Sequence, residues 1–388
     1  MTAGQSVAPR VAFGALREDY AAKRAVIDAA VARVLSSGWF ILGEEVERFE
    51  EEFARWLGVE HVVACANGTE AIALALLGAG VRPGDAVLVP ANTCGPTLAG
   101  VRLAGADARL CDVDPETLTM DAVRAEAACE ASPDVRFLVP VHLYGGAADG
   151  DGLLALAARR GAAVVEDCAQ SHGASVGGRM TGGLGRTAAF SFYPTKNLGA
   201  YGDGGAVATR DAAIAERLRQ LRQYGWTRRD YAEREGWNSR LDELQAAILR
   251  AKLATLAAEN DRRRAIARRY DAAFAGLPLR LLAVREGTVP ARHLYPVRVA
   301  SVASGRREAF QAHLAAHGVE TRIHYPVPLH LQPAYAFLGY RRGDFPVSEA
   351  ACDSVVSLPI YPTLSDAQVD AVIEAVRDFF AAREGARP

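Results

Sequence analysis

The sequence predicts an α/β protein whose central sheet is mostly parallel and is covered by helices on both faces. Apolar strand candidates alternate with helical segments between residues 61 and 167, and this alternation ends after Thr209. The strand candidates are apolar throughout rather than at every second residue, which is typical of parallel strands buried on both faces. Ligands in such sheets bind beyond the carboxyl ends of the strands, so functional residues are expected there.

The composition indicates an ordinary globular protein and excludes several classes of partner. The 388 residues are 50% hydrophobic and carry a net charge of −2, so no basic excess favours nucleic acid or an anionic membrane. The longest apolar run, residues 71–81, is about half of a membrane span. Residues 1–10 contain no hydrophobic signal core, so a cytoplasmic protein is expected.

The six cysteines are scattered without a CxxC pair, and several lie in apolar strand candidates. This usage predicts reduced, buried thiols rather than disulfides or metal ligands, and no metal site is expected.

The elements of the first part follow in order. Residues 1–12 are expected to be disordered, and an amphipathic helix is expected over 44–57, where Val46, Phe49 and Phe53 recur at helical spacing. The alternating region then gives strands near 61–66, 86–90, 108–113, 136–141 and 162–167. Helices are expected between them near 69–79, 94–104, 119–130 and 149–160.

The pattern changes after Thr209. A helix is expected over 211–223, then a polar loop over 224–237 and a long helix over 241–274 that contains no proline or glycine. The remaining chain suggests a smaller α/β domain with a strand at 294–300 and helices at 306–317 and 365–382. We therefore divide the chain into a large domain over 1–250 and a linking helix with a small domain over 251–388.

The stretch 187–209 (TAAFSFYPTKNLGAYGDGGAVAT) has two short apolar strands joined by a glycine-rich loop that contains Lys196. Of the 44 basic residues only Lys23, Lys196 and Lys252 are lysines. Arginine can supply the charge of lysine but not a primary amine that forms a Schiff base. The alternative is a surface lysine on a flexible loop, which the neighbouring Ser191 and the glycines argue against.

Two further motifs border strands. Asn67-Gly68-Thr69-Glu70 begins a helix, and exposed amides there suit a phosphate group, although Asn67 or Thr69 could equally be a plain helix cap. Asp167 ends the run AAVVED, so its carboxylate points into the ligand crevice, unless it caps a following helix. A phosphate cup, an acid for a ring nitrogen and an amine are together what pyridoxal 5′-phosphate requires.

Six segments resemble the DegT/DnrJ/StrS-type sugar aminotransferases, and the resemblance runs from about Val26 to the C-terminus. The segments are NGTEA, VPVHLYG, VVEDCAQSHGA, SFYPTKNLGAYGDGG, GWNSRLDELQAAIL and HYPVPLHLQPAY. The resemblance implies a fold-type-I transferase of the aspartate-aminotransferase kind. It also implies a homodimer whose active sites lie at the subunit interface.

The resemblance also implies roles for individual residues. Lys196 matches the Schiff-base lysine and Asp167 the partner of the pyridine nitrogen, and both are expected to be catalytic. The other cofactor contacts that it implies are Gln170 beside the ring hydroxyl, Gly68, Thr69 and Ser191 at the phosphate, and Asn238 reaching the phosphate from the other subunit. Some relatives carry histidine at the lysine position and are dehydratases, which Lys196 argues against.

One position departs from the family pattern. Many relatives have an aromatic side chain where Cys94 stands, and that ring stacks on the cofactor. Cysteine cannot stack, so either another aromatic residue compensates or this face of the cofactor is more open.

The polar loop bears on the substrate. Its RQYGW segment, with Tyr224, resembles the version in relatives that aminate the 3-position of nucleotide-linked 6-deoxyhexoses, although a surface loop packed by its own aromatics is an equal alternative. Candidate substrate contacts are Tyr224, Tyr193, His324 and Tyr325. For His142, His324, Tyr325 and His330, a structural hydrogen-bonding role is at least as well supported.

The predicted function is transamination of a nucleotide-linked keto-6-deoxy sugar, best matched by a TDP-3-keto-6-deoxyhexose, with L-glutamate as amino donor. The alternatives are a TDP-4-keto-6-deoxyhexose enzyme, a keto-cyclitol aminotransferase of the scyllo-inosose type, and a non-catalytic regulator with this fold.

Overall fold

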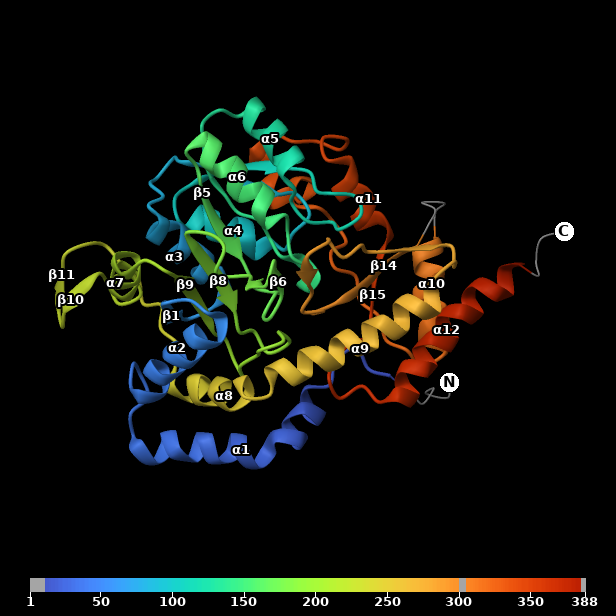
Figure 1. Cartoon of the computed structure of the whole chain (residues 1–388), viewed down its shortest axis with the longest axis horizontal. Helices are drawn as coiled ribbons and strands as arrows, with labels where there is room; N and C mark the ends of the chain where they lie inside the picture. The colour runs from blue at the N-terminus through green and yellow to red at the C-terminus, as the bar shows by residue number, and fades with distance from the viewer. Residues whose placement is uncertain (1–10, 300–304, 385–388) are drawn as a thin grey trace, which may run out of the picture.

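A computed structural model describes residues 11–299 and 305–384 (Figure 1). Its centre is a seven-stranded sheet with the strand order β1-β9-β8-β5-β4-β2-β3. The strands are β1 His61–Cys65, β2 Ala86–Pro90, β3 Asp107–Cys111, β4 Val135–Leu138, β5 Ala163–Asp167, β8 Thr187–Ser191 and β9 Gly205–Thr209. Each predicted strand of this region is present, with ends that differ by a few residues.

The sheet is mostly parallel, as the sequence predicts. The pairs β8–β5, β5–β4, β4–β2 and β2–β3 are parallel, and only β9 runs antiparallel to its neighbours β8 and β1. The carboxyl ends of β5 and β8 therefore meet at one edge, where Asp167 pairs with Ala189 and Ser191 ends β8. That edge is where ligands bind in parallel sheets.

Helices cover both faces of the sheet (Figure 1). They are α2 Glu44–Leu57, α3 Gly68–Ala79, α4 Gly95–Leu103, α5 Ala122–Ala131, α6 Gly150–Arg160 and α7 Ala212–Leu221. Successive residues of β2 point to opposite sides, because Val87 and Val89 join one buried cluster while Ala86 and Leu88 join another. This two-sided burial explains why the strands are apolar throughout.

The N-terminal segment differs from the prediction. The structure begins at Val11, which is fully buried and pairs with Val319, so the expected disorder is wrong for the end of that segment, while residues 1–10 lie outside the described part of the chain. The helix α1 Leu16–Ser37 follows, which we did not predict. Only Ile27, Ala30 and Val34 of α1 are buried, so its apolar stripe is too narrow to stand out in the sequence.

The long helix predicted over 241–274 is in fact two helices. Helix α8 Glu243–Leu253 and helix α9 Leu256–Phe274 are separated at Ala254 and Thr255. The Thr255 hydroxyl donates to the Lys252 carbonyl at 3.2 Å, and a side chain that bonds backbone in this way competes with helix continuation. No proline or glycine marks the break, which is why the sequence pattern missed it.

A second sheet of order β12-β14-β15 lies beyond α9. Its strands are β12 Leu279–Leu281, β14 Tyr295–Val299 and β15 Val355–Leu358, and the helices α10 Arg306–Ala316, α11 Pro346–Ser354 and α12 Asp366–Glu384 accompany it. Three 3₁₀ turns lie at Leu143–Gly145, Leu329–Leu331 and Pro333–Leu338. Strand β14 and helices α10 and α12 match the predicted C-terminal elements, whereas β12, β15 and α11 were not predicted. The division of the chain near residue 250 stays a prediction.

Two small sheets complete the structure. One joins β6 Ser175–Val176 and β7 Arg179–Met180 to β13 Thr288–Val289, and so ties the chain after β5 to the C-terminal part. The other is the hairpin of β10 Trp226–Arg228 and β11 Tyr231–Ala232, which lies at the opposite end of the molecule from α12 (Figure 1). Among residues 11–299 and 305–384, no helix combines the length and apolar character needed to cross a bilayer.

Candidate active site

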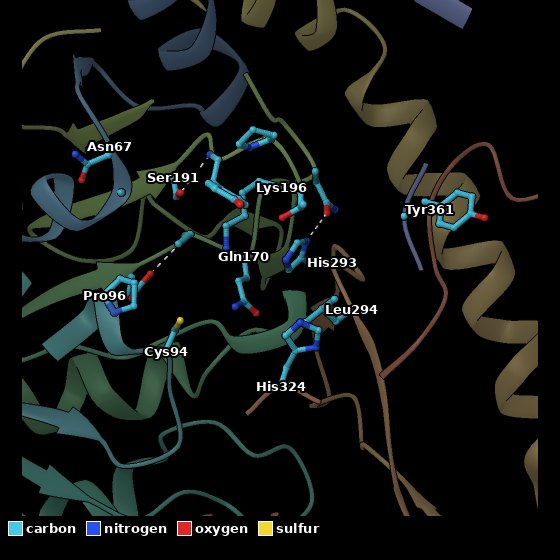
Figure 2. A pocket seen from close by; sticks show the side chains of 18 of the residues that line it. Asn67, Cys94, Pro96, Gln170, Ser191, Lys196, His293, Leu294, His324 and Tyr361 are labelled. Carbon is cyan, nitrogen blue, oxygen red and sulfur yellow. Dashed lines mark hydrogen bonds between the residues drawn. The ribbon is translucent and has the colours of Figure 1, made fainter. Parts of the chain in front are cut away.

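A cavity of about 910 Å³ lies at the carboxyl edge of the central sheet. One wall comes from the sheet and its loops, and the facing wall carries His293, Leu294 and His324 (Figure 2). Nine of the predicted site residues line it, namely Gly68, Thr69, Asp167, Gln170, Ser191, Tyr193, Lys196, His324 and Tyr325. The parallel topology thus brings together residues that are far apart in the sequence.

Asp167 ends β5 and is buried, with 3% of its surface exposed. Its Oδ2 accepts a hydrogen bond from the Thr97 hydroxyl at 2.8 Å, and its Oδ1 accepts one from the Ala169 amide at 3.0 Å. Burial raises the pKa of the Asp167 carboxyl, while these two donors and the nearby Lys196 act against that rise. No helix follows β5 directly, so the helix-cap alternative is wrong.

Lys196 lies in the loop between β8 and β9, which turns back on itself just after Ser191. The Lys196 amide donates to the Tyr193 carbonyl at 2.8 Å, and the Ala200 amide donates to the Phe192 carbonyl at 2.8 Å. A side chain at Gly199 would place its Cβ 2.4 Å from the Pro194 carbonyl oxygen, so the tight turn requires glycine there. Burial lowers the pKa of the Lys196 ammonium, which favours the neutral amine.

The N-terminus of α3 meets the end of β8. Asn67 caps this helix, because its Oδ1 accepts from the Glu70 amide at 2.9 Å, so the cap role of Asn67 is confirmed. A Cβ at Gly68 would lie 2.5 Å from the Ser191 Cβ, so only glycine lets the first turn of α3 approach the Ser191 hydroxyl. The first-turn amides, the Thr69 hydroxyl and the Ser191 hydroxyl form a donor set that fits a phosphate group.

Gln170 is fixed by two hydrogen bonds across the cavity floor. Its Oε1 accepts from the Tyr144 amide at 2.7 Å, and its Nε2 donates to the Tyr325 hydroxyl at 2.9 Å. Burial raises the pKa of Tyr325 well above its usual range, and the adjacent Cys94 thiol adds to the rise. The aromatic residue that contacts Cys94 is thus Tyr325, from the C-terminal part of the chain.

The facing wall holds groups that the sequence did not single out. The His293 Nδ1 lies 3.1 Å from the Asn197 Oδ1, and the Asn197 Nδ2 donates to the Asn260 Oδ1 at 2.8 Å and to the Ala291 carbonyl at 2.9 Å. Phe13, Arg263 and Arg322 also line the cavity. These residues come from separate segments, and no motif or spacing connects them in the sequence.

Two predicted residues do not line the cavity of this chain. Tyr224 is 40% exposed and its ring lies 5.1 Å from that of Trp226, which matches the alternative of a loop packed by its own aromatics. Asn238 is exposed beside the same hairpin. His142 and His330 are also outside the cavity and are buried against Glu166 and Glu349 at 3.0 and 2.9 Å, which supports their structural roles.

Comparison with known proteins gives a consistent result across the chain. Residues 22–377 match the DegT/DnrJ/EryC1/StrS aminotransferase family. The chain is 46% identical to the dTDP-3-amino-3,4,6-trideoxy-alpha-D-glucose transaminase of Streptomyces venezuelae, over 96% of each chain. It is 45% identical to the erythromycin biosynthesis sensory transduction protein EryC1 of Saccharopolyspora erythraea, over 95% of this chain and 99% of that protein.

The fold also matches solved structures. The crystal structure of DesV from S. venezuelae superposes with a TM-score of 0.92 and 46% sequence identity, covering 96% of this chain and 98% of that one. This agreement confirms the predicted fold class, a fold-type-I α/β protein with a mostly parallel central sheet.

Proposed function

Because this chain belongs to the DegT/DnrJ/EryC1/StrS aminotransferase family, we propose that it transfers an amino group to the keto carbon of a nucleotide-linked 6-deoxy sugar. It is a pyridoxal-phosphate-dependent aminotransferase, as its family is. The observation that carries the proposal is that Asp167, Lys196 and the Gly68–Ser191 contact line one cavity. Those groups suit a ring nitrogen, an aldehyde and a phosphate, in that order.

Bound pyridoxal phosphate supplies an aldehyde carbon that a primary amine can bond to and a ring that withdraws electrons from the substrate carbon. In our proposal Lys196 provides that amine through its Nζ. With the cofactor bound, the same Nζ would be the group that takes the proton from the carbon of the amino donor and gives it back. Burial lowers the pKa of Lys196, which shifts its Nζ toward the neutral form that accepts a proton.

Asp167 is proposed to keep the ring nitrogen protonated. A cation beside a buried carboxylate is strongly favoured, because little water screens the pair. The Thr97 hydroxyl and the Ala169 amide hold the two oxygens of Asp167 in place. Gln170, fixed by Tyr144 and Tyr325, is proposed to pack near the ring hydroxyl, and Gly68, Thr69 and Ser191 to hold the phosphate.

The sugar is proposed to be a TDP-3-keto-6-deoxyhexose. The support is the RQYGW segment together with 46% identity to a relative named as a dTDP-3-amino sugar transaminase. L-Glutamate is proposed as the amino donor, which would leave as 2-oxoglutarate. A 4-keto sugar and a keto-cyclitol are the alternatives for the same chemistry.

We further propose a homodimer that shares its active sites. Tyr224 and Asn238 stand outside the cavity of their own chain and are exposed, so both are free to meet a second copy. In that arrangement Asn238 would reach the phosphate of the partner site. Tyr224, Tyr193, His324 and Tyr325 would contact the sugar or its nucleotide.

An absorption titration tests the substrate. L-Glutamate should remove the visible absorption of the bound cofactor, and after the excess is washed out the two sugars are added separately. Return of the absorption with TDP-3-keto-6-deoxyglucose and not with TDP-4-keto-6-deoxyglucose is the expected result. Return with the 4-keto sugar alone would reject the C3 proposal, and return with neither would point to keto-cyclitols.

A further inference from the structure

Arg263 is a buried arginine at the active-site cavity. It lies on α9, lines the cavity and has 7% of its surface exposed. Its Nη1 donates to the Ile360 carbonyl at 2.8 Å and to the His293 carbonyl at 3.4 Å. Neither acceptor carries a charge, so the guanidinium is held in place without being neutralised.

Arg263 has no ion pair of its own in the part of the chain that the structure describes. Glu259 and Asp19 are near enough to oppose the fall of its pKa, but Glu259 is paired with Lys23 at 2.7 Å and Asp19 with Lys252 at 3.2 Å. No acidic oxygen among those residues lies within 4.0 Å of its guanidinium, and its Nε has no hydrogen-bond partner among them. The other buried cation of this wall, Lys252, is paired with Asp19 at 3.2 Å and donates to the Gly199 carbonyl at 2.7 Å. A buried charge without a partner is strongly unfavourable, so an anion is the expected neighbour of Arg263.

The surroundings favour a negative ligand. Burial lowers the pKa of Arg263 to about 10, so the guanidinium is still charged at neutral pH. Burial, with Lys196 and Arg263 nearby, lowers the pKa of His293 well below its usual value, and burial lowers that of His324 to about 4. The two histidines are therefore neutral, and they neither compete with Arg263 for an anion nor supply one.

The position of Arg263 indicates which anion of the reaction it can bind: the cofactor phosphate, the nucleotide diphosphate or a carboxylate of the amino donor. The donor set suited to the cofactor phosphate lies at Gly68 and Ser191, on the sheet side, whereas Arg263 donates to the backbone carbonyl of His293, a residue of the facing wall. Arg322 also lines the cavity, and its side chain is 60% exposed. A bulky nucleotide diphosphate can therefore reach Arg322 more readily than the buried Arg263. A small carboxylate fits the enclosed guanidinium, which bonds carboxylates through two parallel hydrogen bonds.

We propose that Arg263 binds a carboxylate of the amino donor and of the 2-oxo acid that it becomes. This proposal rests on the proposed transamination. It makes Arg263 the residue that recognises a dicarboxylic amino acid and not the sugar. Arg263 acts here in binding and does not take part in proton transfer. The same guanidinium would be free of ligand when the sugar occupies the cavity.

The test compares Arg263→Gln and Arg263→Lys with the control Arg262→Gln in the cofactor-loaded enzyme. Arg262 suits this purpose because it also donates to a backbone carbonyl of the C-terminal part, that of Leu364 at 2.7 Å, and does not line the cavity. Two titrations are followed by the cofactor absorption, one with L-glutamate and one with the amino sugar product. A third measures binding of glutarate, a dicarboxylate that cannot react.

Loss of a charged hydrogen-bond partner should raise the L-glutamate and glutarate concentrations for half-saturation by about 10- to 100-fold in Arg263→Gln. Arg263→Lys should fall between Arg263→Gln and the wild type, and Arg262→Gln should match the wild type. The amino sugar titration should not change in any variant. If Arg263→Gln does not fold, the comparison of the other two variants is sufficient, and Arg263→Lys is expected to bind glutarate more weakly than Arg262→Gln.

Equal glutarate affinity in the wild type and in both Arg263 variants would overturn the proposal, as would a wild type that does not bind glutarate. A parallel loss of affinity for the amino sugar would also overturn it, because the effect would then be structural. L-Alanine and 4-aminobutyrate, which each lack one carboxylate, show which carboxylate is bound. Failure of the sugars to react leaves the glutarate measurement intact, so this proposal and the proposed function fail separately.

Discussion

The two sides of the proposed active site are built in different ways. On the cofactor side, Asp167, Ser191 and Lys196 come from the ends of neighbouring strands and the loop after them, and all three line the cavity of a single chain. On the other side, Tyr224, expected at the substrate, and Asn238, expected at the cofactor phosphate, are exposed beside the β10–β11 hairpin and do not line that cavity. One chain therefore assembles most of the groups for the cofactor, but it does not bring Asn238 or Tyr224 to its own cavity.

This difference shows how each set of side chains is positioned. The cofactor groups are positioned by sheet register and tight turns, which are properties of one folded chain. The backbone at Tyr224 is also fixed, since its amide donates to the Trp237 carbonyl at 2.9 Å, but the side chains of Tyr224 and Asn238 are exposed. A second copy of the chain is the partner that we propose for them. The predictions below separate the two halves, from the largest expected effect to the smallest.

Replacing Lys196 should have the largest effect. Lys196→Ala removes the only proposed amine and proton carrier, so turnover should fall by about 1,000-fold or more. Lys196→Arg is the matched control, since it restores the charge without a suitable amine, and it should be equally inactive. Product formation from keto sugar and L-glutamate measures the effect. A biological role that survives Lys196→Ala would favour the non-catalytic regulator instead.

Replacing Asp167 should have the next largest effect. Asp167→Asn keeps the size of the side chain but removes the negative charge proposed to hold the ring nitrogen protonated, so turnover should fall by about 100-fold. Thr97→Val, which removes the 2.8 Å hydrogen bond to Asp167 and the 2.9 Å hydrogen bond with the Thr93 hydroxyl, should lower turnover by about tenfold. Equal turnover for Asp167→Asn and the wild type would reject the proposed role.

The negative charge of Asp167 should lower the stability of the cofactor-free protein. Burial raises the pKa of Asp167 in the folded chain, so the folded state holds its proton more tightly than the unfolded state does. Ionisation at neutral pH therefore lowers the free energy of unfolding, and cofactor-free Asp167→Asn should be more stable than the wild type there. The advantage should disappear below pH 3.8, the ordinary pKa of the carboxyl, where both states are protonated. Urea unfolding as a function of pH checks this, and a less stable Asn variant at neutral pH would contradict it.

Replacing Tyr224 should have the smallest effect and should change one half-reaction only. Tyr224→Phe removes one hydroxyl that we expect to meet the sugar or its nucleotide, so KM for the keto sugar should rise by about three- to tenfold. The titration with L-glutamate should not change, because Tyr224 is expected to meet the sugar or its nucleotide and not the amino donor. A change in both half-reactions would mean that Tyr224 acts on folding rather than on the sugar.

The features of the molecule that could be predicted from the sequence also differ from those that could not. The strands around Asp167 and Ser191 and the loop at Lys196 could be predicted, because apolar runs and glycine positions are local signals. Helix α1 and the break at Thr255 could not, since one depends on a narrow buried stripe and the other on a single side-chain hydrogen bond. Arg263 and His293 were missed because only the tertiary fold brings them to the cavity.

Subunit mixing tests the central claim most directly. Lys196→Ala and Asn238→Ala proteins are each expected to be inactive, and they are unfolded together in equal amounts and refolded. If the sites are shared, half of the dimers contain both variants, and each of these has one site with both lesions and one with none. About one quarter of wild-type activity should then return. No recovery, in a mixture shown to contain mixed dimers, would contradict an active site completed by the second chain.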